Sequence, residues 1–251
     1  INMIDVLKDC MSGNDYIVND NIILHHPAIH EIRDYGEEEY TRLIYSYLTA
    51  VPYDYMVQLD DMGIDYTKMT DFDLFGFLCM NLPKDLTKII FGDIDFTEFA
   101  VMEDSSIGEK YLYNGITQTR IDSVTYSIIV EFIRSIHILD KKRKFNVGSD
   151  LARRELIQSE RENQAIRARS KKKDDNKIIG NMLSSLIWSG MSNYNWDNIW
   201  DLKIYHLFDG INRIEKIKNY DNTMFGYFSG NVDISKIDQR SLHWLGNLRD
   251  V

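Results

Sequence analysis

Apolar residues recur at helical spacing along most of the chain, and short polar or glycine-containing stretches separate the runs. An Asp or Thr often stands at the start of such a run, as helix caps do. Asp122 and the Thr70–Asp73 pair are the clearest cases. Gly36 interrupts the first long run, so we expect a late start or a bend there. The pattern predicts helices over residues 28–50, 53–62, 70–82, 83–91, 122–139, 176–189 and 196–229, and a short last helix capped by Asp238.

Two stretches follow a strand pattern instead. In residues 16–26, "YIVNDNIILHH" places β-forming residues on both sides of Asn19 and Asp20, which indicates a hairpin. Residues 96–116 contain "FTEFAVM" and "KYLYNGI" around a turn-rich centre, which indicates a second hairpin. With only three prolines in the chain, the fold class we expect is mainly α. No internal repeat is apparent.

The helical pattern weakens in one segment in the middle of the chain. We therefore expect two helical lobes with one or two small β-hairpins, joined by a basic connector that is helical or mobile. The boundaries that we predict are 1–140 for the N-terminal lobe, 141–174 for the connector and 175–251 for the C-terminal lobe. A chain of 251 residues with 44% hydrophobic residues can form a core of this size.

The connector is also where the positive charge gathers. The stretch "KKRKFNVGSDLARRELIQSERENQAIRARSKKK" holds 12 Lys or Arg and four Asp or Glu, a charge of +8. The whole chain carries −10, so the other 218 residues carry −18, which is −10 less +8. Residues 151–169 favour a helix but contain few apolar side chains. Such a helix lies in solvent or gains its burial from a partner.

Three explanations of this charge remain open. The segment could be a solvated connector, it could dock on an acidic protein surface of this chain or another, or it could bind nucleic acid. Phe145 is its single aromatic residue and the rest of the chain is acidic, so the pattern argues against nucleic acid. For the docking reading we select four candidate partner-binding residues, Arg153, Arg154, Arg167 and Arg169.

The sequence offers little catalytic chemistry. His25, His26 and His30 form the densest histidine cluster, but the residues between them do not make a zinc-protease motif. The acidic pairs Asp60–Asp61, Asp71–Asp73 and Asp93–Asp95 fit helix caps as well as metal ligands. Cys10 and Cys79 lack metal spacing, and Cys79 stands on an apolar face, where a buried inert thiol is expected. We predict no enzyme, no cofactor and no metal, and keep a metal-dependent enzyme as the alternative.

Apolar runs such as "IIF" and "IIV" are far too short to cross a bilayer, and the acidic start "INMIDVLKDC" does not indicate secretion. The C-terminal stretch "SLHWLGNLRDV" gathers Leu242, Trp244, Leu245 and Leu248 near a chain end, where residues fray unless they are anchored. Trp244 and Leu245 are therefore two further candidate partner-binding residues. They could dock on this chain's own second lobe or on a partner.

Several stretches together resemble a group of bacteriophage and prophage proteins from Gram-positive hosts. They are "HPAIHEIRDYGEEEY", "VQLDDMGIDYTKMTDFDLFGFLC", "FGDIDF", "IWDLKIYHLFDGINRI" and "SGNVDISKIDQRSLHWLGNL", about a third of the chain without the connector. The resemblance is one of order and character, and it brings no catalytic residues with it. Proteins of this type are similar to those encoded among tail-morphogenesis genes, which include tail-assembly chaperones.

The resemblance implies a non-enzymatic morphogenesis protein, a chaperone of tail proteins such as the tape-measure protein. It implies a place in the host cytoplasm, or in the virion if the protein is instead a structural tail or neck component. The expected partners are tail proteins or a second copy of the chain, with no membrane. Abundant Met and Tyr suit this reading, because such side chains adapt to varied helical partners.

Overall fold

The structure is a computed structural model that describes residues 3–106, 108–141, 147–170, 178–238, 243–246 and 248. Parts of the predicted connector, residues 142–146 and 171–174, lie outside the described residues. So do residues 239–242 of the predicted last helix. The predicted fold class is confirmed, because the fold is 60% helical with two small antiparallel sheets.

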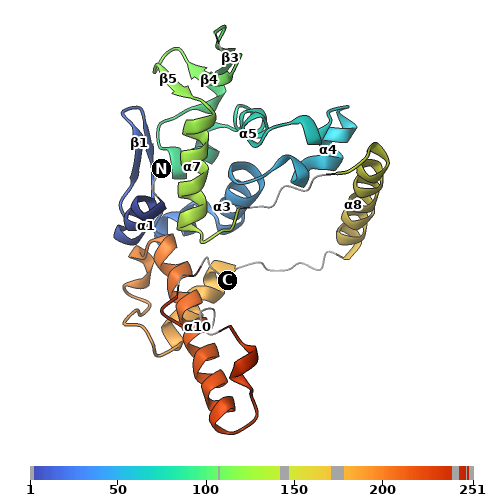
Figure 1. Cartoon of the computed structure of the whole chain (residues 1–251). Coiled ribbons are helices and arrows are strands. Elements are labelled where there is room, and N and C mark those ends of the chain that lie inside the picture. Colours follow the sequence, from blue (N-terminus) through green and yellow to red (C-terminus); the bar gives the residue numbers. More distant parts are fainter. Residues whose placement is uncertain are drawn as a thin grey trace.

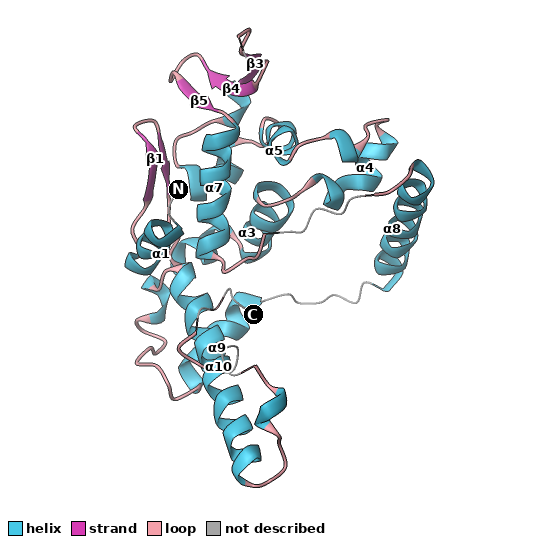
Figure 2. Ribbon diagram, viewed as in Figure 1, coloured by secondary structure: helices cyan, strands magenta, loops and turns pink. Residues whose placement is uncertain are grey.

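Ten α-helices occur in the described part of the chain (Figures 1 and 2). They are α1 (Met3–Ser12), α2 (Ile29–Tyr35), α3 (Glu37–Arg42), α4 (Met56–Asp61), α5 (Asp71–Cys79), α6 (Lys84–Phe91), α7 (Ser123–Ile136), α8 (Asp150–Ser170), α9 (Ile178–Trp188) and α10 (Ile204–Phe228). Shorter turns join them: a π-helical turn η1 (Leu43–Leu48) and the 3₁₀ turns η2 (Pro52–Tyr55), η3 (Tyr66–Lys68), η4 (Phe96–Glu98), η5 (Ile199–Asp201) and η6 (Ile234–Lys236).

Both predicted hairpins form. Strands β1 (Tyr16–Asn19) and β2 (Ile22–Leu24) pair around the predicted turn, and β3 (Ala100–Glu103) pairs with β4 (Lys110–Asn114). A third strand, β5 (Thr119–Ile121), extends the second hairpin into a sheet of order β3–β4–β5. Strand β5 was not predicted, because its three residues are too few for an alternating pattern.

The predicted helix starts are confirmed by their caps. Thr70 and Asp73 form a reciprocal capping box at the start of α5, and the Asp122 carboxylate accepts the Thr125 backbone N–H at the start of α7. The first long run is interrupted at Gly36, whose φ of 107° lies in the region that favours glycine. The run therefore becomes α2, α3 and η1.

The predicted helix over residues 196–229 begins later than expected. Leu202 is extended, and its carbonyl accepts the Ile29 backbone N–H at 2.9 Å, while Ile204 N–H donates to the Pro27 carbonyl at 3.0 Å. These bonds form an isolated bridge between Ala28 and Lys203. Because pairing of this kind needs extended backbone, α10 cannot begin before this bridge.

Helix α7 stands at the centre of the larger part of the molecule, where it contacts α1, α10, β1, β5 and η1 (Figure 1). One continuous core surrounds it and draws residues from both sides of the predicted connector, from Val6 to Leu207. Helix α10 runs from this core outward as a stalk, and α8 stands to one side against α4 (Figure 2). The predicted lobe boundaries stay a prediction.

A short segment recurs three times, at Gly63–Met69, Gly92–Phe99 and Gly230–Ile237. In each copy a glycine with φ of 73°, 59° or 76° follows a helix. An Asp then accepts the backbone N–H of the Thr or Ser two residues later, at 3.1, 3.0 and 3.1 Å, and starts a 3₁₀ turn. The expectation of no internal repeat is therefore wrong at this scale.

Candidate partner-binding groove

An apolar groove lies between η3, α5 and the β3–β4 strands, with a volume of about 610 Å³. Its floor is made of aliphatic, methionine and phenylalanine side chains. Phe77 and Val101 are 42% and 55% exposed, which is high for such residues. The apolar residues lining the groove are Ile64, Met69, Phe72, Gly76, Phe77, Met80, Val101 and Leu112.

Helix α5 forms the floor because it is apolar on nearly every side. Phe75 and Cys79 point into the core and are 2% and 0% exposed, while Phe77 is on the opposite, open side. Gly76 lets the sheet approach closely, since a Cβ placed there would lie 3.2 Å from Leu112 Cδ2. The close contact between α5 and β4 therefore depends on this glycine.

Two lysines edge the apolar floor. Lys68 Nζ lies 3.8 Å from Asp65 Oδ2, and Lys110 Nζ lies 3.8 Å from Asp73 Oδ1. The Thr67 hydroxyl and backbone N–H donate to Asp65, and these bonds lower the pKa of that carboxyl. Local bonds from Thr67 and Thr70 thus occupy the two carboxylates, and the lysine side chains, 82% and 59% exposed, border the groove.

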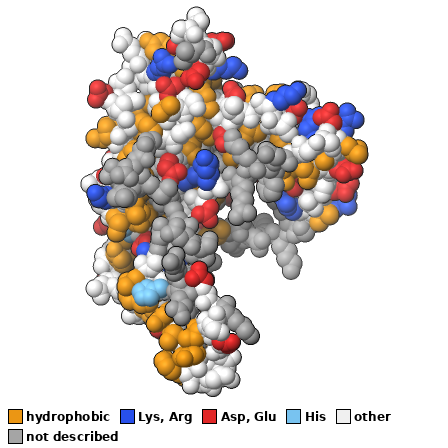
Figure 3. All heavy atoms as spheres, in the orientation of Figure 1, with side chains coloured by type: hydrophobic (Ala, Val, Ile, Leu, Met, Phe, Trp, Pro, Cys, Tyr) orange, Lys and Arg blue, Asp and Glu red, His pale blue; other side chains and the backbone are white. Residues whose placement is uncertain are grey.

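The basic helix α8 packs against the back of this groove. Its Ile157 is 5% exposed and joins a second small core with Met56, Val57, Leu59 and Tyr66. Arg153 Nη1 lies 3.1 Å from Asp65 Oδ1. Arg161 reaches Asp61 Oδ1 at 2.7 Å and Asp60 Oδ2 at 3.1 Å. Figure 3 shows blue and red side chains interspersed on this side of the molecule.

The other predicted arginines lie elsewhere on α8. Arg154 and Arg169 are exposed. Arg167 Nη1 lies 3.3 Å from Glu160 Oε1 on the same helix. The structure thus brings Arg153 to the acidic surface of α4 and η3 and leaves Arg154, Arg167 and Arg169 away from it. Arg161, which was not among the predicted residues, makes the closest ion pair of the contact, 2.7 Å to Asp61.

The predicted tail residues lie beside the stalk. Arg213 of α10 donates to the carbonyls of Trp244 and Gly246, at 3.0 and 2.7 Å. The Trp244 side chain is 38% exposed and Leu245 is 65% exposed. Hydrophobic side chains gather at the end of the stalk (Figure 3), where Phe225 and Phe228 are 77% and 78% exposed.

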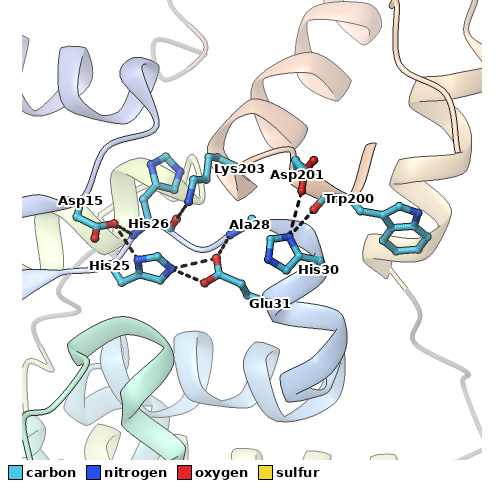
Figure 4. Close-up of polar contacts among 9 residues, drawn as sticks. All are labelled: Asp15, His25, His26, Ala28, His30, Glu31, Trp200, Asp201 and Lys203. Carbon is cyan, nitrogen blue, oxygen red and sulfur yellow. Dashed lines mark hydrogen bonds and ion pairs between the residues drawn. The ribbon is translucent and has the colours of Figure 1, made fainter. Parts of the chain in front are cut away.

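The three histidines do not converge (Figure 4). His25 lies between two carboxylates, 2.8 Å from Asp15 Oδ1 and 2.9 Å from Glu31 Oε1. His30 Nδ1 lies 3.1 Å from the Trp200 carbonyl. His26 is fully buried, and its backbone carbonyl accepts a bond from Lys203. These contacts join the chain around residues 25–31 to the start of α10.

The acidic pairs lie at helix ends and turns, as the cap reading predicts. Asp73 caps α5, Asp95 caps η4 and accepts bonds from Thr97, and Asp93 lies 3.1 Å from Lys84 Nζ. Cys10 and Cys79 are buried, and burial raises the pKa of the Cys79 thiol. Across the part of the chain that the structure describes, no group of three His, Cys, Asp or Glu side chains is placed to hold a metal ion.

The sequence analysis noted abundant Met and Tyr but did not select the groove residues. Phe77, Met80 and Val101 come from a helix and a strand that are 20 residues apart in the chain, so their neighbourhood depends on the tertiary fold. The signal available was the helix "DFDLFGFLC", which has more apolar positions than one buried face needs. An excess of this kind indicates a second apolar contact.

Comparison with known families finds a match in the C-terminal part of the chain. Residues 170–249, which include α9 and α10, match the family model described as the YomV second domain. YomV is a Bacillus prophage protein of the SPβ type. The match supports the prophage part of the resemblance for this region. No curated protein and no solved structure matches the chain. None of the described helices is long and apolar enough to cross a membrane.

Proposed function

We propose that this protein is a non-enzymatic chaperone of phage tail assembly, which holds an apolar helix of a tail protein in the groove on α5. The observation that carries the proposal is the apolar floor of the groove, where Phe77 and Val101 are exposed beside the partly buried Met80. A helix with one apolar face fills a groove of this kind, and methionine and phenylalanine adapt to clients of different sequence.

The charges fit such a client. Lys68 and Lys110 border the floor, so a helix with acidic residues beside its apolar face gains favourable contacts at both edges. The tape-measure protein is the client that the phage resemblance suggests. The prophage family match over residues 170–249 supports a phage context but gives no function for the groove.

The test is binding of purified protein to helical fragments of the tape-measure protein encoded by the same prophage. Val101→Asp places a charge in the apolar floor, and we expect it to weaken binding about tenfold or more. Val124→Asp is the matched control, since Val124 is 68% exposed at the start of α7. Equal binding by both variants would rule out the groove as the client site.

Mass spectrometry of purified phage particles separates the chaperone from the virion alternative. A chaperone leaves the assembling tail and should be absent from the particles. Its presence in stoichiometric amount would instead make the protein a structural tail or neck component.

A further inference from the structure

Helix α8 and the groove share one thin wall. Ile64 and Met69 line the groove on one side and pack against the small core around Ile157 on the other. Asp65, between them, lines the groove and pairs with Arg153 of α8. The whole wall is the segment 62–69, which contains one 3₁₀ turn and no longer element.

The contact of α8 with this wall is narrow. Arg153, Ile157 and Arg161 stand four residues apart on one helical face. Arg153 pairs with Asp65 of the wall, Ile157 is buried behind it, and Arg161 pairs with Asp60 and Asp61 at the end of α4, directly before the wall. Other apolar residues of α8, Leu151 and Ile166, are 68% and 61% exposed. The helix is therefore held mainly by charges near the surface, which salt screens.

Without α8, the wall would lose its support. The small core behind it has five buried residues, and Ile157 of α8 is one of them. Tyr66, which packs there, follows Asp65 directly, so a displacement of α8 changes the packing of the residues that form the groove edge. The exposed ion pairs make this displacement the low-energy opening of the region.

We infer that α8 is a salt-sensitive latch that holds the groove wall in its binding shape, so that docking of α8 and binding of a client strengthen each other. The inference rests on the proposed function for the existence of a client. The effect of α8 on residues 62–69 does not depend on that function. Coupling between two sites is reciprocal, so a bound client should also hold α8 in place. The basic segment, whose role the sequence alone left open, thereby receives a regulatory role.

The first measurement is amide hydrogen exchange of the full chain, followed by mass spectrometry. The amides of Gly63 and Ile64 bond to the Asp60 and Leu59 carbonyls at the end of α4, at 2.9 and 2.8 Å, and the Lys68 amide bonds to the Asp65 carbonyl within the wall at 3.0 Å. These three amides report the order of the wall and its attachment to α4. Arg161→Glu replaces two attractions by two repulsions. We expect faster exchange in both α8 and residues 62–69, by about fivefold or more.

Arg154→Glu is the matched control, because it makes the same charge change on the same helix. Arg154 is exposed, and no ion pair of the described residues involves it. The double variant Arg161→Glu/Asp61→Arg restores opposite charges at the closer pair, while Asp60 still opposes the new carboxylate, and should recover part of the protection. Raising NaCl from about 0.05 M to about 1 M should act like Arg161→Glu, since the Debye length falls to about 3 Å.

The second measurement is binding of the anionic dye 1-anilinonaphthalene-8-sulfonate, followed by its fluorescence. Only the part of the fluorescence that Val101→Asp abolishes is assigned to dye in the groove. Arg161→Glu should weaken this binding about fivefold, and the double variant should restore it in part. Two results would overturn the inference. In the first, Arg161→Glu speeds exchange in α8 but changes neither the exchange of residues 62–69 nor dye binding. In the second, Arg161→Glu does not change the exchange of the α8 amides. If the parent protein gives no groove signal, the proposed function fails, and exchange of residues 62–69 alone decides the latch.

Discussion

Two buried histidines should make the stability of this protein fall steeply in mild acid. His26 is 0% exposed and His137 is 3% exposed. Burial, with Lys203 as the next cause, lowers the pKa of His26 from 6.5 to about 3. Burial also lowers the pKa of His137 to about 4. Both residues are therefore neutral in the folded protein at pH values where the unfolded chain would protonate them.

The hydrogen bonds of His137 define its neutral tautomer, while burial is what disfavours the charged ring. Nδ1 donates to the Ile133 carbonyl at 2.6 Å, so Nε2 is the acceptor of the Tyr40 hydroxyl at 2.7 Å. A proton on Nε2 would face that hydroxyl donor inside the core. To accept the proton, the ring would need the Tyr40 hydroxyl to turn and become the acceptor, and the hydroxyl proton would then lose this partner.

The sign of the effect follows from proton counting. When the pKa of a histidine is lower in the folded state than in the unfolded state, the unfolded state binds more protons than the folded state below pH 6.5. The free energy of unfolding therefore rises with pH in that range. Each histidine contributes about 1.4 kcal/mol per pH unit between its folded and unfolded pKa. From pH 6.5 to 4.5 each should cost about 2 kcal/mol, and both together about 4 kcal/mol. The free energy of unfolding of a domain is about 5–15 kcal/mol, so a loss of this size is a large part of the total.

The assay is urea unfolding followed by circular dichroism at pH 7, 6, 5 and 4.5. Work above pH 4.5 avoids the carboxylates Asp65 and Asp95, whose pKa the Thr67 and Thr97 hydroxyls lower. His26→Leu should reduce the pH slope by about half, whatever it does to absolute stability, whereas His243→Gln, at an exposed position, should leave it unchanged. A flat profile in the parent protein would refute the reasoning.

Three further changes test single contacts. Tyr40→Phe leaves His137 Nε2 buried without its donor and should cost about 1–3 kcal/mol in urea unfolding, whereas Tyr45→Phe, at a 39% exposed residue, should cost less. Gly76→Ala should destabilise by about 1 kcal/mol despite the better helix propensity of alanine, because its Cβ meets the buried Leu112; a stabilised variant would show that Leu112 can move. Trp244→Ala should cost about 1–2 kcal/mol, since the ring is only 38% exposed; unchanged melting with weaker client binding would instead indicate docking on a partner.

Local rules in the sequence predicted the elements well. The capping pair Thr70–Asp73, the cap Asp122 and the interruption at Gly36 depend on residues within a few positions of each other. The start of α10 could not be found in this way. It is set by hydrogen bonds between residue pairs such as Ile29 and Leu202, which are far apart in the chain.

The candidate site was less predictable than the fold, for the same physical reason. Charge counting left a solvated connector, docking on an acidic surface and nucleic-acid binding open for residues 141–173. In the structure, Arg153 pairs with Asp65. Choosing Arg161 over Arg167 required the direction of each side chain on α8 relative to α4. The groove depends on Val101 of β3 and Phe77 of α5 lining the same hollow, a proximity that no local pattern contains.

The recurring Gly–Asp–3₁₀ segment connects these observations. Its local bonds are nearly identical in the three copies, so its Asp and Thr or Ser residues specify a turn and nothing more. What differs is the residue after the Asp and what packs on it. Phe96 is 0% exposed and contacts Phe75, Phe91 and Phe99 in the main core. Tyr66 instead packs with Ile157 of α8, behind the groove. The same turn thus supports the core in one place and carries the proposed latch in another, so the function of each copy is set by the element that packs against it.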